Sequence, residues 1–220
     1  SRMATLLHIL AHPHPETSLT ARISSAFLDA YRAAHPGDTV RDISLFRAPV
    51  SYLGAAHLAA MRKHEHPDTM TAEEADAWRE ITDHLEPFCA ADNYLVTAPM
   101  WNLGVPAVLK AYIDQILQPS YTFRYTGPGM AEGLCAGKRM VIISSRGGVY
   151  SLPVMRELEM CVRYLRAIFG FIGIEVVAEL VAEGLAIVGP RQQEEILAPL
   201  LERARDLGRT FDGREHRQAA

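Results

Sequence analysis

The sequence predicts an α/β fold in which one parallel sheet is covered by helices on both faces. Short apolar runs typical of β-strands alternate along the chain with longer amphipathic stretches typical of helices. Five strand-like runs occur, and no internal repeat, low-complexity tract or linker divides the 220 residues. Regular alternation of strands and helices places the strands parallel, because each helix returns the chain to the same edge of the sheet.

The five expected strands share a short, apolar and β-branched composition, and they cover residues 5–10, 39–43, 93–98, 139–145 and 175–182. The third has a continuous apolar centre, which is expected of a strand buried on both faces.

The expected helices share amphipathic periodicity, and they cover residues 18–34, 71–90, 106–117, 153–169 and 191–210. Thr17 or Ser18 is the expected N-cap of the first helix, and Thr71 is the expected N-cap of the second. The stretch 44–70 has mixed character, with a short helix expected at 55–63. The loop-rich stretch 119–137 is expected to hold a small hairpin.

Five strands in this pattern favour the flavodoxin-like order 2-1-3-4-5. Such sheets bind ligands at the carboxyl ends of their strands, near the switch between the first and third strands. Residues 3–211 are expected to form a single domain. Ser1 and Arg2, which precede Met3, are expected to be a vector-derived remnant, and 212–220 a flexible tail.

Composition excludes several classes of protein. The chain is 49% hydrophobic and 22% charged, with a net charge of −4, so the basic face needed for nucleic acid is missing. The apolar runs are far shorter than the roughly 18 residues of a membrane span. Three cysteines without CxxC spacing argue against a disulfide framework and a zinc site. A cytoplasmic location without a membrane partner is therefore expected.

The loop after the first strand ends in hydroxyl side chains at the start of a helix. A helix N-terminus has free N–H groups and a partial positive charge, so it suits a phosphate. His12, Ser18 and Thr20 could add side-chain donors, with Leu19 between them. An ordinary N-cap is the alternative interpretation. The sequence has neither a Walker lysine nor a GxGxxG motif, so a nucleoside triphosphate or a Rossmann dinucleotide is not indicated.

The loops after the third and fourth strands also carry unusual residues. Pro99, Met100, Trp101, Asn102 and Leu103 follow the third strand, and a planar heterocycle could lie against them. Trp101 could instead be a core or interface aromatic.

After the fourth strand, Ser145 and Arg146 precede Gly147 and Gly148. Glycines permit close backbone approach and positive φ, and their N–H groups could stabilise negative charge on a ring. A plain strand-to-helix turn is the alternative interpretation.

These motifs, in this order, resemble the FMN-dependent NADH-azoreductase family of flavodoxin-like quinone reductases. The resemblance covers residues 93 to 185 and is carried by 99–103, 109–114, 122–126, 137–138, 144–148, 169–174 and 182–184. It implies a homodimer that holds FMN non-covalently and uses NADH or NADPH to reduce quinones and azo compounds. The first loop departs from the family, because Ala11-His12-Pro13-His14-Pro15 stands where serines are usual.

The resemblance implies FMN contacts at His12, Ser18 to Thr20, Met100 to Leu103 and Ser145 to Gly148. The Asn102 N–H is the expected partner of flavin N5, and the two glycines are expected near N1 and O2. Trp101 and Tyr125 are expected to line the substrate pocket.

The cofactor carries the hydride, so no catalytic side chain is expected. One exposed ring face would have to serve donor and acceptor in turn, which predicts ping-pong kinetics. Three alternatives remain open: an electron-transfer flavodoxin, an NAD(P)H:FMN reductase and a non-enzymatic regulatory protein on the same fold. No metal site is expected, and His64 and His66, with Glu65 and Asp68, are interpreted as a solvated loop.

Overall fold

The computed structural model describes residues 3–48 and 50–211; the expected remnant at 1–2 and the expected tail at 212–220 lie outside the described residues. Five parallel strands form the main sheet: β1 (Thr5–Leu10), β2 (Thr39–Ser44), β3 (Asn93–Pro99), β6 (Arg139–Ser145) and β7 (Glu175–Ala182). Their order is β2-β1-β3-β6-β7, so the predicted order 2-1-3-4-5 is confirmed.

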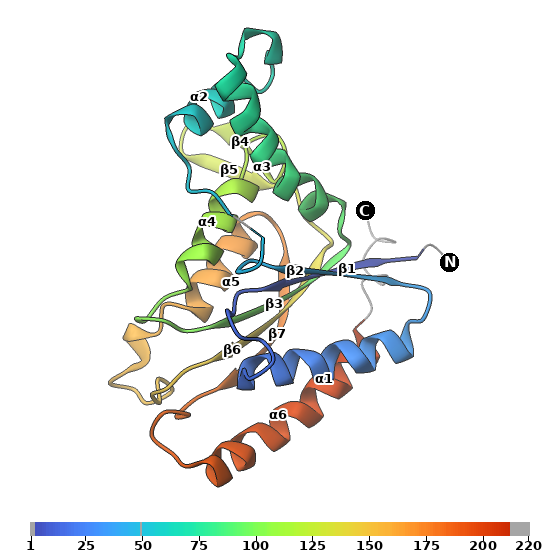
Figure 1. The fold of residues 1–220 in the computed structure, drawn as a ribbon, viewed down its shortest axis with the longest axis vertical. Coiled ribbons are helices and arrows are strands. Elements are labelled where there is room, and N and C mark those ends of the chain that lie inside the picture. Colours follow the sequence, from blue (N-terminus) through green and yellow to red (C-terminus); the bar gives the residue numbers. More distant parts are fainter. Residues whose placement is uncertain (1–2, 49, 212–220) are drawn as a thin grey trace.

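Helices cover both faces of this sheet (Figure 1). One face packs against α1 (Leu19–Ala34) and α6 (Pro190–Thr210), and the other against α3 (Ala72–Ala90), α4 (Ala107–Ile116) and α5 (Val162–Phe171). The alternation of side chains along β1 explains the two cores, because Leu6 joins the α1 side while Leu7 and Ile9 join the other.

A smaller lobe projects beyond the sheet at the top of Figure 1. It contains α2 (Ala55–Lys63), the start of α3 and the antiparallel hairpin of β4 (Phe123–Gly127) and β5 (Met130–Gly133). The short helix and the hairpin that the sequence predicted are confirmed. The helix α3 begins with a capping box: Thr71 Oγ1 accepts from the Glu74 N–H, and Glu74 accepts from the Thr71 N–H.

The predicted start of one helix is wrong. The sequence predicted a helix over 153–169, but α5 begins at Val162, and the residues before it are irregular apart from a 3₁₀ turn at Arg156–Leu158. The Glu159 carboxylate accepts from the N–H groups of Cys161, Val162 and Arg163, so it ends the irregular segment by capping the helix. Tertiary contacts of the preceding residues hold them out of helical geometry.

Among the described residues, no helix combines the length and apolar character needed to cross a membrane.

Candidate functional site

The loops after β1, β3 and β6 lie at the same end of the sheet, on the left in Figure 1. Three predicted segments are therefore brought together: 12–20, 99–103 and 145–148. Direct contacts join them. The Met100 N–H donates to the Ser145 carbonyl at 2.8 Å, and the hydroxyls of Thr20 and Ser145 hydrogen-bond to each other.

The loop after β3 is a tight two-residue turn. Trp101 and Gly104 exchange both backbone hydrogen bonds, at 3.0 and 3.1 Å. Asn102 (φ 48°) and Leu103 (φ 71°) lie between them in the left-handed region. Two consecutive positive φ values are typical of a type I′ turn, where asparagine is common but leucine is strained. Among the described residues, no acceptor is bonded to the Asn102 N–H, which leaves it available for a ligand.

The glycine pair after β6 is fixed through its carbonyl groups. The Gly147 carbonyl accepts from the Ala186 N–H at 3.1 Å, and the Gly148 carbonyl accepts from the Gly184 N–H at 2.9 Å. Within the described part of the chain, neither glycine N–H has an acceptor. The loop therefore holds two free donors in place, as an anion-stabilising backbone would require.

The reason for glycine at these positions differs from the sequence prediction. Neither Gly147 nor Gly148 has positive φ. A Cβ on Gly147 would lie 2.8 Å from the Ala186 Cβ, and one on Gly148 would lie 3.0 Å from the Tyr150 ring. The close approach is therefore to this chain's own residues. Positive φ occurs instead at Gly184 (75°), in the turn that supports the pair.

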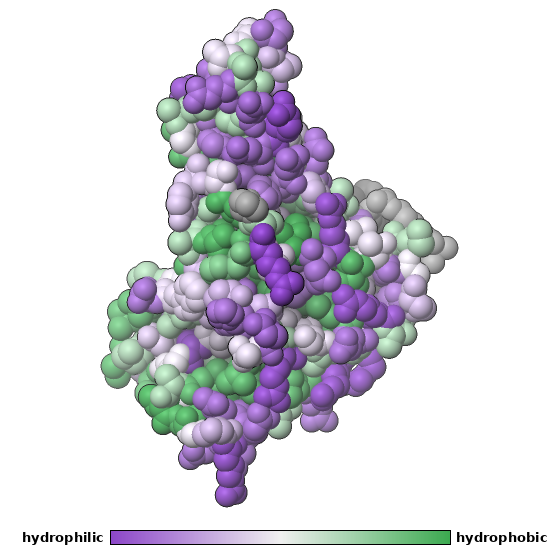
Figure 2. Space-filling view, viewed as in Figure 1, coloured by the Kyte–Doolittle hydropathy of each residue, from purple (hydrophilic) through white to green (hydrophobic). Residues whose placement is uncertain are grey.

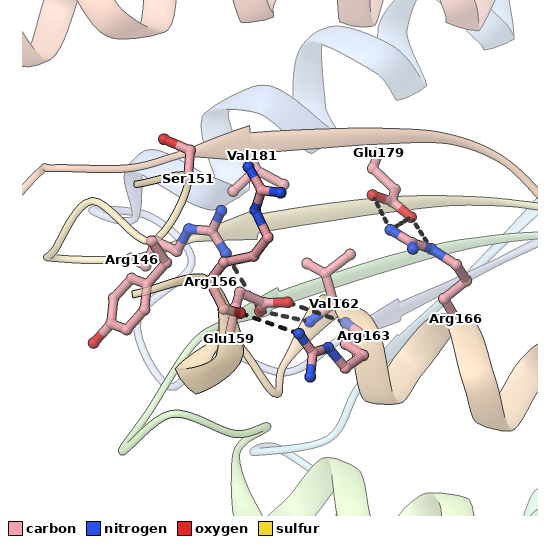
Figure 3. Close-up of a pocket in the computed structure, with 10 residues that line it drawn as sticks. Arg146, Ser151, Arg156, Glu159, Val162, Arg163, Arg166, Glu179 and Val181 are labelled. Atoms are coloured by element: carbon pink, nitrogen blue, oxygen red, sulfur yellow. Dashed lines mark hydrogen bonds and ion pairs between the residues drawn. The ribbon is translucent and has the colours of Figure 1, made fainter. Parts of the chain in front are cut away.

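The Arg146 side chain stabilises the loop through ion pairs within this chain. Its guanidinium is 3.3 Å from Glu159 (Figure 3) and 3.1 Å from Glu183, and it lies over the Tyr150 ring. The three charged side chains are 77–89% buried, since their exposures are 11%, 13% and 23%. Arg146 therefore joins the start of α5 to the end of β7.

Glu183 holds the residues that follow the glycine pair. It accepts from the N–H groups of Tyr150 and Ser151 and from the Ser151 hydroxyl. Burial opposes ionisation of Glu183, but these hydrogen bonds and the Arg146 charge outweigh it and lower its pKa. Sequence reasoning assigns no role to this carboxylate, although Ala182-Glu183-Gly184 is among the motifs of the resemblance.

At the start of α1, Ser18 is the N-cap, as expected: Ser18 Oγ accepts from the Ala21 N–H at 3.2 Å. Leu19 and Thr20 then begin the helix, and no described residue accepts from their N–H groups. His12 Nδ1 accepts from the His14 N–H at 3.1 Å, which leaves Nε2 as the protonated nitrogen. Partial burial lowers the pKa of His12 below its ordinary value. These donors fit a phosphate group.

Two other predicted residues need comment. Tyr125 lies on the β4–β5 hairpin with 71% of its surface exposed, and it has no described contact with the three loops. The sequence predicted a solvated loop at His64, and this prediction is wrong. The His64 ring packs with the rings of Trp78 and Tyr121, at centroid distances of 5.3 and 5.8 Å. Over the described ranges, no group of three or more His, Cys, Asp or Glu side chains could hold a metal.

The fold defines a flavodoxin-like α/β protein, and its loops gather free backbone N–H groups at the carboxyl edge of the sheet. A flavodoxin-like family model matches residues 4–207. The chain belongs to this family, and within it to the homologues of FMN-dependent NADH:quinone oxidoreductases and azoreductases.

Two relatives are an FMN-dependent NADH:quinone oxidoreductase from Staphylococcus haemolyticus (37% identical over 210 residues) and one from Clostridium acetobutylicum (39% over 212 residues). Each alignment covers 95% of this chain and all of the relative.

Solved structures agree. An azoreductase from Bacillus anthracis is 34% identical, with a TM-score of 0.88 over 95% of this chain and all of that one. An FMN-dependent NADH-azoreductase from the same species, solved in complex with FMN, is 28% identical, with a TM-score of 0.84 over 94% of this chain and all of that one.

Proposed function

We propose that the protein is an FMN-dependent oxidoreductase that uses NADH or NADPH to reduce quinones and azo compounds. The observation that carries the proposal is a set of free backbone donors at one end of the sheet, at Asn102, Gly147 and Gly148. These donors belong to a chain that is similar over 95% of its length to FMN-dependent NADH:quinone oxidoreductases. Residues 3–211 act in this proposal as one FMN-binding domain.

When bound, FMN would accept a hydride from the nicotinamide and pass it to the acceptor. The chain's residues would bind and orient it. The Asn102 N–H is suited to flavin N5, and the N–H groups of Gly147 and Gly148 are suited to stabilise negative charge near N1 and O2. Pro99, Met100, Trp101 and Leu103 would line the ring from the end of β3 and the turn after it. Ser145 would line it from the end of β6. Arg146 would act only through its ion pairs.

The phosphate would lie against the start of α1. His12 Nε2, the N–H groups of Leu19 and Thr20, and the Thr20 hydroxyl are its proposed donors, since this hydroxyl can accept from Ser145 while it donates to the phosphate. Thr20 links this phosphate subsite to the ring loops through Ser145. Ser18 contributes by capping the helix, which fixes the direction of the two free N–H groups.

We further propose that nicotinamide and acceptor use one pocket in turn, which gives ping-pong kinetics. Trp101 is 42% exposed beside the ring turn and is suited to line this pocket. Tyr125, on the projecting hairpin, can line it only if it belongs to a second copy or if the hairpin moves.

A second copy of this chain is the proposed partner. An apolar groove of about 450 Å³ lies between the β3–α4 turn and α5, lined by Gly104, Val105, Lys110, Met160, Arg163, Tyr164 and Ala167. Exposed apolar side chains continue it along the irregular segment: Leu152, Val154, Leu158 and Met160. Figure 2 shows apolar residues gathered at this end of the molecule, at the lower left. A monomer would leave this patch in water.

The proposal is tested on the purified protein. We expect a yellow protein with the absorbance of bound FMN, and rapid oxidation of NADH by menadione. A protein that binds FMN but does not turn over NADH would favour the electron-transfer alternative. Loss of flavin on gel filtration during turnover would favour the FMN reductase. Sedimentation should give about twice 24.4 kDa, and a fully active monomer would contradict the dimer.

A further inference from the structure

Phe46 lies beside the proposed ring site. It follows β2, a strand after which the sequence predicted no site motif. It stands two residues after the end of β2, whose carboxyl end lies at the same edge as those of β1 and β3. Leu45 is buried, and the Arg47 and Ala48 N–H groups both donate to the Ser44 carbonyl at 3.1 Å. This turn fixes the backbone from which the Phe46 ring projects.

The Phe46 ring packs edge to face on Trp101. The ring centroids are 5.8 Å apart and the planes are inclined by 63°. Both side chains remain accessible, with 39% of Phe46 and 42% of Trp101 exposed. Phe46 therefore does not bury the indole in the core. The two rings form a single accessible aromatic surface beside Asn102.

The Trp101 side of this pair is held rigidly. Trp101 is bonded through both backbone groups to Gly104, and the Leu103 carbonyl of the same turn accepts from the Met160 N–H at 3.0 Å. Rigid aromatic surfaces favour planar aromatic ligands, because stacking there orders few side-chain rotors. Because the two ring planes are inclined by 63°, a planar ligand stacked on the indole would meet Phe46 at an angle, and a second fused ring would gain this contact where a single ring would not.

We propose that Phe46 determines substrate specificity by extending the Trp101 surface for the second ring of a bicyclic quinone. The inference rests on the proposed function and deepens it: it assigns fused-ring acceptors as the preferred class. Phe46 takes no part in binding FMN or in receiving electrons from NADH. Its contribution should therefore appear only in the oxidative half-reaction.

The test compares Phe46→Leu, which keeps an apolar side chain without a ring, with Phe46→Tyr, which keeps the ring. The acceptors are menadione, which has two fused rings, and 2-methyl-1,4-benzoquinone, which has one. For Phe46→Leu, kcat/KM for menadione should fall about three- to tenfold, the range expected for one aromatic contact. That for the benzoquinone should change less than about twofold, and Phe46→Tyr should remain near the parent.

Separate measurements distinguish this inference from the function on which it rests. FMN content and the stopped-flow rate of flavin reduction by NADH should be equal in the parent and both variants. Equal losses for the two quinones, no loss, or a slower reaction with NADH in Phe46→Leu would overturn the inference and leave the proposed function standing. Failure of the parent to hold FMN or to oxidise NADH would instead refute the proposed function.

Discussion

The Met160 N–H donates to the Leu103 carbonyl at 3.0 Å, across 57 residues of sequence. This bond ties the irregular segment before α5 to the strained turn that carries Trp101 and Asn102. The turn and the glycine loop are thus positioned by a shared framework, in which Arg146, Glu159 and Glu183 form the charged part.

Leu103 should tolerate only residues that accept its backbone conformation. At φ 71°, a β-branched side chain is strained, whereas asparagine is readily accommodated. We expect Leu103→Val to weaken FMN binding by about tenfold, the equivalent of 1–2 kcal/mol of strain. Leu103→Asn is the control and should bind FMN like the parent in a fluorescence titration. Equal affinities for all three proteins would show that the turn does not position the flavin.

Gly147 should not tolerate a methyl group. A Cβ there would lie 2.8 Å from the Ala186 Cβ, so the loop must shift and its free N–H group with it. We expect Gly147→Ala to raise the FMN Kd by about tenfold or more, the effect of losing one or two hydrogen bonds to developing charge. Gly37→Ala is the control, because no atom lies within 4 Å of a Cβ added at Gly37. The assignment fails if Gly147→Ala retains full affinity.

Thr20 should discriminate between FMN and riboflavin. Its hydroxyl and N–H lie at the start of α1, and the hydroxyl also bonds to Ser145. We expect Thr20→Val to lower FMN affinity by about tenfold, in line with one hydrogen bond to a charged group, and to leave riboflavin affinity nearly unchanged. Calorimetric titration of both flavins measures the difference. If the parent protein binds the two flavins equally well, the proposed phosphate subsite is refuted.

Glu183 should hold the loop as a carboxylate. Its acceptor bonds to Tyr150 and Ser151 keep its pKa low despite burial, so the loop is held at neutral pH and released as the carboxyl is protonated in acid. Glu183→Gln keeps the size but removes the charge opposite Arg146. We expect FMN affinity to fall severalfold at pH 7. Because the pKa of Glu183 is lowered from its ordinary value of 4.5, the parent should lose FMN affinity below about pH 4.5, and this loss should be smaller in Glu183→Gln. Superimposable pH profiles would contradict this role.

Acid should weaken the fold itself through Asp42. The hydrogen bond from His8, at 2.8 Å, lowers the pKa of Asp42, while partial burial opposes it and Arg32 assists it. A carboxyl with a lowered folded pKa stabilises above its unfolded pKa of about 3.9 and loses this contribution as pH falls through the folded value.

Urea melts at pH 6, 4 and 3 test this contribution. The free energy of unfolding of Asp42→Asn should be lower than that of the parent at pH 6, and the difference should narrow at pH 3. The control is Asp68→Asn, at an exposed position on the small lobe. Its free energy of unfolding should differ from that of the parent by the same amount at all three pH values. A constant difference for Asp42→Asn as well would show that His8 does not favour the ionised carboxylate.

The sequence by itself determined the sheet and most helices. Apolar runs such as 93–98 have the composition of a strand buried on both faces, and caps such as Thr71 act within one turn of their own helix. It also determined that the three predicted loops meet, because parallel strands bring their carboxyl ends to one edge. That this edge holds the flavin stays a prediction.

Tertiary structure decided what local pattern could not encode. Residues 153–161 have helical character in the sequence, but the hydrogen bonds of Tyr150 and Ser151 to Glu183 and the capping of α5 by Glu159 keep them irregular. The direction of Arg146, the packing of Gly147 on Ala186 and the pairing of Phe46 with Trp101 all join residues 13 to 55 positions apart. Such contacts depend on how helices and loops pack on the sheet, so no periodicity or local motif reports them.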